Sequence, residues 1–126
     1  MAELTTQEVT IQVVYSPERQ ADPISAVPEK AYLFTKKYPN TAVWRLSSSD
    51  ADAKISRIVF EGSREHGPLS TIKPNADDHC HWVGPCLENA EKGEFKYSIF
   101  VMNGKGEEIE LDPVMAIDLP DGGGGG

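Results

Sequence analysis

Hydrophobic and polar residues alternate with a period of two along most of the chain, and apolar residues seldom recur at helical spacing. The first clear example spans residues 9–15, in which four apolar side chains would share one face: Val9, Ile11, Val13 and Tyr15. A strand buried on one face shows this pattern, whereas an amphipathic helix repeats every three or four residues. The pattern therefore predicts an all-β protein.

Three further segments that precede residue 61 are also predicted to be strands: 31–34, 41–47 and 54–60. In the second of them Trp44 lies on the apolar side, where an aromatic ring can fill the space between two sheets. In the third, strict alternation would put Ile55 on the opposite face from Ile58 and Phe60. These segments extend the β pattern over the first half of the chain.

Residues 61–92 are predicted to run over the surface as a long connection. The stretch 61–75 is polar and contains two glycines and two prolines, which interrupt regular structure, with a short strand around 69–72. Binding residues tend to gather on long connections of rigid β scaffolds. We therefore treat this connection as a candidate recognition surface.

Two strongly patterned segments close the chain. Residues 94–102 alternate apolar with polar side chains, and Asn103-Gly104 then supplies residues that tolerate positive φ in a tight hairpin turn. From Ile109 to Leu119 the apolar residues keep one parity across Pro113. Proline lacks the N–H that a β-ladder needs, so Pro113 should mark a break or a bulge in the final strand.

Six or seven short strands separated by turns favour an antiparallel β-sandwich of about seven strands, immunoglobulin-like or cupredoxin-like, in one domain over residues 1–120. Six side chains should be buried between its sheets: Trp44, Phe60, Phe95, Tyr97, Ile99 and Val101. We assign structural roles to Trp44, Tyr97, Asp112 and Pro113. Asp112 should point away from the core and accept a hydrogen bond from a backbone N–H or a tyrosine hydroxyl.

Residues 43–119 carry an ordered set of short motifs. The Trp44 strand is followed by Ile58-Val59-Phe60, then by Gly93-Glu94-Phe95-Lys96-Tyr97 and a glycine-containing hairpin, and finally by Leu111-Asp112-Pro113 with apolar residues after it. In this order of motifs the chain resembles a loose group of small uncharacterised bacterial proteins. The resemblance implies a cupredoxin-like or immunoglobulin-like sandwich and no particular activity.

The charge balance argues against several classes of partner. The 126 residues include 20 acidic ones against 12 lysines and arginines, a net charge of −8. Nucleic acids and anionic membranes attract Lys and Arg, so we expect neither as a partner. No apolar run is long enough to span a bilayer, and residues 1–8 lack the basic and apolar regions of a secretory signal. The chain is therefore expected to be cytoplasmic.

Two histidines and two cysteines lie between residues 79 and 86. On an extended strand His79 and His81 would share a face and could chelate zinc or copper, with a thiolate of Cys80 or Cys86 added. The two thiols could also form a disulfide or a redox switch, although a reducing compartment disfavours the bond. The simpler interpretation is a polar surface segment, for which we expect no cofactor. A metal-binding or redox-sensing protein is kept as the alternative function.

No catalytic motif accompanies these residues. The chain lacks a nucleophile elbow, and residues 103–106 lack the spacing and the following helix of a phosphate loop. We therefore expect a non-enzymatic binding module with a protein partner. Its surface would include Trp82, His81, Val83 and His66, with the indole as an exposed anchor, unless Trp82 instead plugs the end of the sandwich. An unpaired edge strand would also favour a two-fold homodimer.

The segment 121–126 ends in five consecutive glycines and should be a flexible tail. Deleting it should leave the melting temperature unchanged within about 1 °C, because glycine has no side chain to bury. Thermal unfolding of the full-length and shortened chains measures the difference. A fall of several degrees would mean that the glycines pack against the domain.

Overall fold

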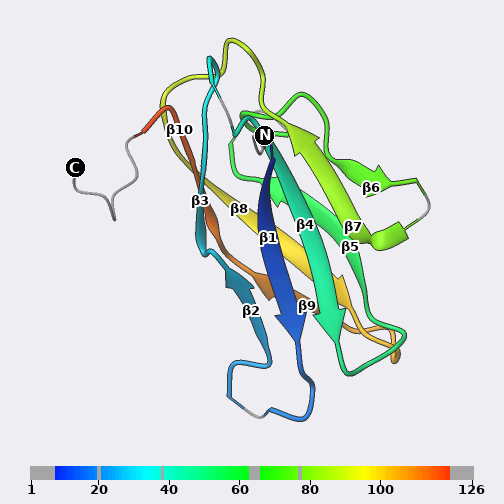
Figure 1. Ribbon diagram of the computed structural model, residues 1–126. Coiled ribbons are helices and arrows are strands. Elements are labelled where there is room, and N and C mark those ends of the chain that lie inside the picture. Colours follow the sequence, from blue (N-terminus) through cyan, green and yellow to red (C-terminus); the bar gives the residue numbers. More distant parts are fainter. Residues whose placement is uncertain (1–7, 20, 38, 63–65, 77, 120–126) are drawn as a thin grey trace, which may run out of the picture.

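Ten strands and no helix make up the part of the chain that the computed structural model describes, residues 8–19, 21–37, 39–62, 66–76 and 78–119. The strands form two sheets packed face to face (Figure 1), so the predicted all-β sandwich is confirmed. The expected tail, 121–126, lies outside the described residues. Within those residues no helix is long and apolar enough to cross a membrane.

Each sheet contains five strands. The first has the order β2 (Ile24–Val27), β1 (Glu8–Tyr15), β4 (Thr41–Ser48), β7 (Asp78–Pro85) and β6 (Lys73–Asn75). The second has the order β3 (Lys30–Leu33), β10 (Val114–Ile117), β8 (Gly93–Met102) and β5 (Lys54–Phe60), and β9 (Glu108–Leu111) also pairs with β8.

Both sheets are mixed, which differs from the purely antiparallel sheets that we predicted. β1 is parallel to β4, and β3 is parallel to β10. Parallel neighbours need a long connection between them. The chain provides one after β1 by forming β2 in the first sheet and β3 in the second before it returns as β4.

The prediction that 61–92 is one surface connection is wrong, because it contains β6 and the eight-residue strand β7. β7 pairs along β4, with Trp82 directly opposite Trp44, and the side chain of Trp82 faces the core. The strand begins with Asp, His, Cys and His, so its polar residues hid the alternation on which the prediction depended. The irregular parts that remain lie on either side of β6 and β7.

A β-bulge changes the predicted faces of β5. The pairing of β5 with β8 shifts register between Ile55 and Arg57, so Ser56 is the extra residue. An extra residue reverses the alternation beyond it. Ile55, Ile58 and Phe60 are therefore all buried in the core, and the prediction that Ile55 lies on the opposite face is wrong.

The last strand is broken at the predicted place. The first half of β8 pairs with β10 and its second half with β9, and Asp112-Pro113 separates those two partners. Asp112 is exposed as expected, but its carboxylate accepts a hydrogen bond from the Ser98 hydroxyl at 3.2 Å, not from a backbone N–H or a tyrosine. In the β8–β9 hairpin the positive φ falls on Gly106 and not on Asn103-Gly104.

The core is centred on aromatic rings from both sheets. Trp44 and Tyr97 are almost fully buried, and the indole Nε1 of Trp44 donates a hydrogen bond to the Tyr97 hydroxyl at 3.1 Å. The Phe60 ring stacks on Tyr97 with 4.7 Å between ring centroids. Five of the six predicted core residues are buried, while Phe95 is half-buried at the edge of the core.

Replacing Tyr97 with Phe should lower the free energy of unfolding by about 1–3 kcal/mol, because the buried N–H of Trp44 loses its acceptor. Denaturant unfolding measures the change. Ser98→Ala on the same strand is the control, since its hydroxyl contacts only exposed carboxylates, and it should change stability by about 0.5 kcal/mol or less. Equal effects of the two changes would show that the indole hydrogen bond contributes nothing.

Candidate functional site

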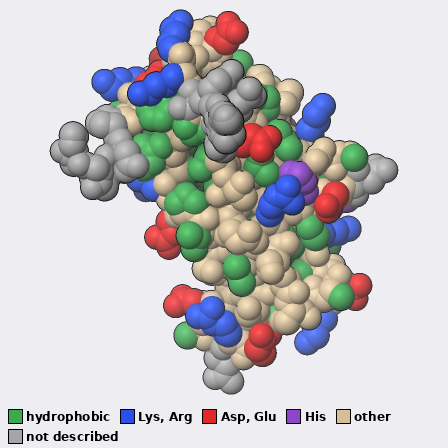
Figure 2. All heavy atoms as spheres, viewed as in Figure 1, with side chains coloured by type: hydrophobic (Ala, Val, Ile, Leu, Met, Phe, Trp, Pro, Cys, Tyr) green, Lys and Arg blue, Asp and Glu red, His purple; other side chains and the backbone are tan. Residues whose placement is uncertain are grey.

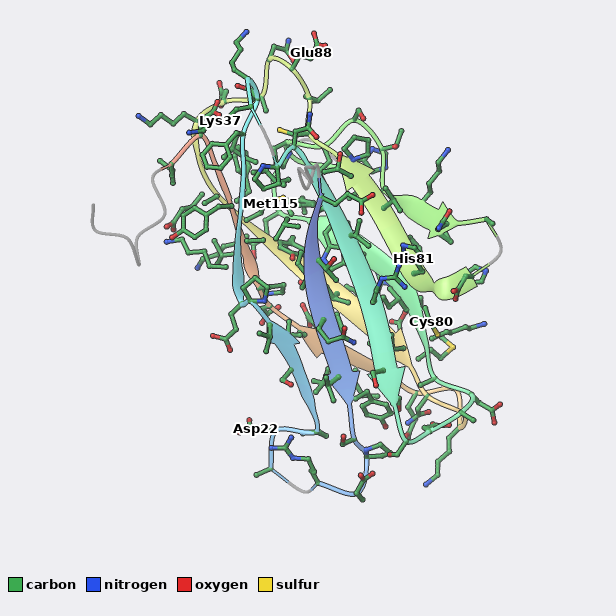
Figure 3. All side chains as sticks on the ribbon, viewed as in Figure 1. Asp22, Lys37, Cys80, His81, Glu88 and Met115 are labelled. Carbon is green, nitrogen blue, oxygen red and sulfur yellow. The ribbon has the colours of Figure 1, made fainter. Side chains whose placement is uncertain are left out.

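The histidines and cysteines that suggested a metal site are separated by the alternation of β7. His79 and His81 share the outer face of the sheet, as expected for an extended strand. Cys80 has the opposite parity, and its thiol lies 3.5 Å from the carbonyl oxygen of Ala53. Figure 3 shows His81 over the front of β7 and Cys80 beside the beginning of the strand. The cluster in the sequence is therefore not a cluster in space.

Cys86 lies beyond the other end of β7, where its thiol contacts the carbonyl oxygen of Leu87 at 3.4 Å. Five residues of extended chain lie between the two cysteines, which gives a span of about 20 Å, whereas a disulfide needs Cα atoms about 4–7 Å apart. Both thiols are free. Over the described ranges, no three His, Cys, Asp or Glu side chains are arranged to hold a metal ion. His66 lies in the loop before β6.

Both thiols are also poorly suited to redox chemistry. Burial raises the pKa of the Cys86 thiol to about 11, and the charge of Asp118 adds to the effect. Burial and the charge of Asp78 raise the pKa of Cys80 as well. Since the thiolate is the reactive form, these surroundings suppress reactivity.

Trp82 is not the exposed anchor that the sequence suggested as one of its two interpretations. Its side chain is only 8% exposed and packs in the core. The indole N–H donates a hydrogen bond to the carbonyl oxygen of His79 at 2.8 Å, so its polar atom is satisfied. The burial of Trp82 supports the other interpretation, in which its ring fills space inside the sandwich.

The middle of the outer face of the first sheet carries little charge, while Glu8 at the start of β1 and Lys73 at the start of β6 lie on the same face nearer its ends. The register between its strands places ten outward side chains side by side, and among these ten Arg45 alone carries a full charge. We call them the neutral face: Thr10, Gln12, Val14, Ser25, Val27, Arg45, Ser47, His79, His81 and Val83. Figure 2 shows this side of the molecule, with charged groups mostly around its margin.

One row of the neutral face crosses four of the five strands of the sheet. Val27, Gln12, Arg45 and His81 are successive partners in the registers of β2, β1, β4 and β7. The Gln12 amide donates to the Arg45 carbonyl oxygen at 3.2 Å, and the Asn75 amide lies 3.1 Å from Nδ1 of His81. Val27, at 67% exposure, is the most exposed large hydrophobic side chain of the described residues.

The outer face of the second sheet has the opposite character. Arg57 forms an ion pair with Glu108 at 3.1 Å and lies 3.8 Å above the centre of the Phe100 ring. Lys30 pairs with Glu94. Charges that are paired with one another and exposed to water are typical of a solvated surface. The two sides of the sandwich therefore differ in what they can bind.

The residues of this row were missed by sequence reasoning, with the exception of His81. The alternation along β1 and β4 identifies Gln12 and Arg45 as outward residues. However, no local signal places β1 between β2 and β4, because strand order depends on contacts far apart in the sequence. No protein-family model matches the chain, and no curated protein matches it significantly.

Cys86 should react with a thiol reagent at neutral pH about a hundredfold more slowly than a free cysteine, because its pKa lies at about 11 against an ordinary 9.0. The rate of iodoacetamide labelling, followed by mass spectrometry of the Cys86 peptide, measures this. Labelling in strong denaturant provides the control. A native rate equal to the denatured rate would restore the redox hypothesis.

Proposed function

We propose that this chain is a non-enzymatic interaction module whose neutral face binds an acidic region of a protein partner. The observation that carries the proposal is the contrast between a chain of net charge −8 and a group of ten neighbouring outward residues in which Arg45 is the single charge. The centres of protein interfaces are depleted of charged side chains and enriched in Arg. The neutral face has both features.

The apolar side chains of the neutral face favour a macromolecular partner. Val27 is largely exposed at one edge of the sheet, and Val14 and Val83 are half-buried within it. An open sheet face encloses a small molecule less well than a cleft does, but it can pack against a second protein surface. Burial of these valines would contribute affinity, and the polar residues beside them would set the orientation.

Hydrogen-bond donors at the centre of the face favour an acidic partner. The Arg45 guanidinium forms no ion pair with any carboxylate in the described ranges. Beside it, an Asn75 amide that donates to Nδ1 leaves the neutral His81 ring with its proton on Nε2, where it acts as a donor. A carboxylate can therefore meet a charged donor here, while the rest of the acidic chain repels it.

This surface keeps part of the recognition region that the sequence suggested. His81 and Val83 belong to the neutral face, whereas Trp82 faces the core and His66 lies outside the strand. The ten residues of the neutral face include no carboxylate that could meet Arg45 of a second copy in a two-fold homodimer, so we favour a different protein as the partner. The exclusion of nucleic acids and membranes depends on composition, and a cytoplasmic location is a further part of the proposal.

Arg45→Glu should abolish capture of the partner, and Lys96→Glu on the opposite sheet is the control with the same change of charge. A photo-reactive amino acid at Ser47 should cross-link a protein from the host cell, whereas the same group at Ser98 should not. We expect the Ser47 cross-link to fall at least tenfold with Arg45→Glu and to persist with Lys96→Glu. Equal cross-linking from both faces, or no effect of Arg45→Glu, would contradict the proposal.

A further inference from the structure

A groove opens between β1 and β3, away from the neutral face. Its volume is about 400 Å³, within the size range of ligand-binding pockets. Two aromatic side chains, two prolines, one valine and one lysine line it: Tyr32, Phe34, Pro28, Pro39, Val9 and Lys30. In Figure 2 green side chains extend down the left side of the molecule, over β3 and β2 in the orientation of Figure 1. The groove is thus a largely apolar surface that the neutral face does not include.

The groove is held in place from several directions. β3 pairs with β10 along its length, and just beyond β3 the backbone N–H and hydroxyl of Thr35 donate to the Asp118 carboxylate at 2.9 and 2.7 Å. The backbone N–H of Phe34 donates to the carbonyl oxygen of Pro39 at 3.0 Å, which closes the turn after β3. A preformed site loses little conformational entropy when a ligand binds.

Lysines flank the aromatic rings. The ammonium of Lys37 lies 4.6 Å from the centre of the Phe34 ring, and that of Lys30 lies 5.7 Å from the centre of the Tyr32 ring. Lys30 is also paired with Glu94, whereas Lys37 forms no ion pair with a described carboxylate. Lys37 therefore places a positive charge beside the groove that no described carboxylate neutralises, and this charge favours a ligand that carries acidic groups.

We propose that this groove binds an extended, proline-rich segment that carries acidic residues. Aromatic-lined grooves bind polyproline II segments because those segments are already extended and lose little entropy. Tyr32 and Phe34 are two residues apart on an extended chain, a spacing of about 6.6 Å. Two residues of a polyproline II helix advance about 6.2 Å, and residues two apart occupy two of its three edges, so prolines at this spacing can pack against both rings while the third edge points away. Acidic residues that flank these prolines would then reach Lys37.

The probe is a synthetic ten-residue peptide, Glu-Pro-Pro-Glu-Pro-Pro-Glu-Pro-Pro-Glu, with both ends blocked. Titrated into the ¹⁵N-labelled full-length chain, it should shift the amide resonances of Ala31 to Phe34 and leave those of Arg45 and His81 in place. Replacing every proline of the peptide with Ala, or every Glu with Lys, should each weaken binding at least fivefold. Binding of the alanine peptide with equal affinity, or shifts that avoid residues 28–39, would overturn the proposal.

Variants of the chain test the same site. The side chain of Lys37 is exposed, and Lys37→Glu should weaken binding of the peptide at least fivefold. The matched change Lys96→Glu, also at an exposed lysine, should leave the affinity unchanged. Arg45→Glu should also leave peptide binding unchanged, which separates the groove from the neutral face. Phe34→Ala should abolish binding in a chain whose spectrum shows that it is folded. Unaltered affinity of both Lys37→Glu and Phe34→Ala would refute the groove as the binding site.

Discussion

The contact between Trp44 and Tyr97 is the interaction on which the rest of the sandwich depends. It joins the middle of β4 in one sheet to the middle of β8 in the other, and it pairs two polar atoms that are both buried. A shift of either strand by one residue would turn its aromatic ring outward and leave the partner's polar atom unsatisfied. Because the contact keeps Trp44 inside, it also keeps Arg45 outside.

The two candidate binding surfaces follow from how the chain is divided between the sheets. β2 pairs in the first sheet and β3, three residues later, pairs in the second, so the chain changes sheets at Pro28 and Glu29. This crossing places Pro28 beside the groove, while β2 stays at the edge of the neutral face with Val27 exposed. A single change of sheet therefore separates the two surfaces.

Although the protein as a whole is acidic, each of the two candidate surfaces offers a positive charge to an acidic partner. Exposed charges act over about 8 Å at physiological ionic strength, so the local arrangement matters more than the total of −8. Arg45 on the neutral face and Lys37 at the groove are not paired with described carboxylates, whereas Arg57 and Lys30 are. Net charge by itself would have suggested a basic partner, and the structure leads to a different inference.

The sequence by itself determined the features that depend on neighbouring residues. The alternation in β1 and β8, the hairpin after β8, the burial of Trp44 and the break at Pro113 all have local causes, since side-chain direction and proline geometry are properties of short segments. Only the tertiary structure decided the rest. The bulge at Ser56, the inward side of β7 and the row from Val27 to His81 depend on which strands become neighbours and in what register. Packing between residues far apart in the sequence decides which strands become neighbours. This packing leaves no periodic signal in any single strand.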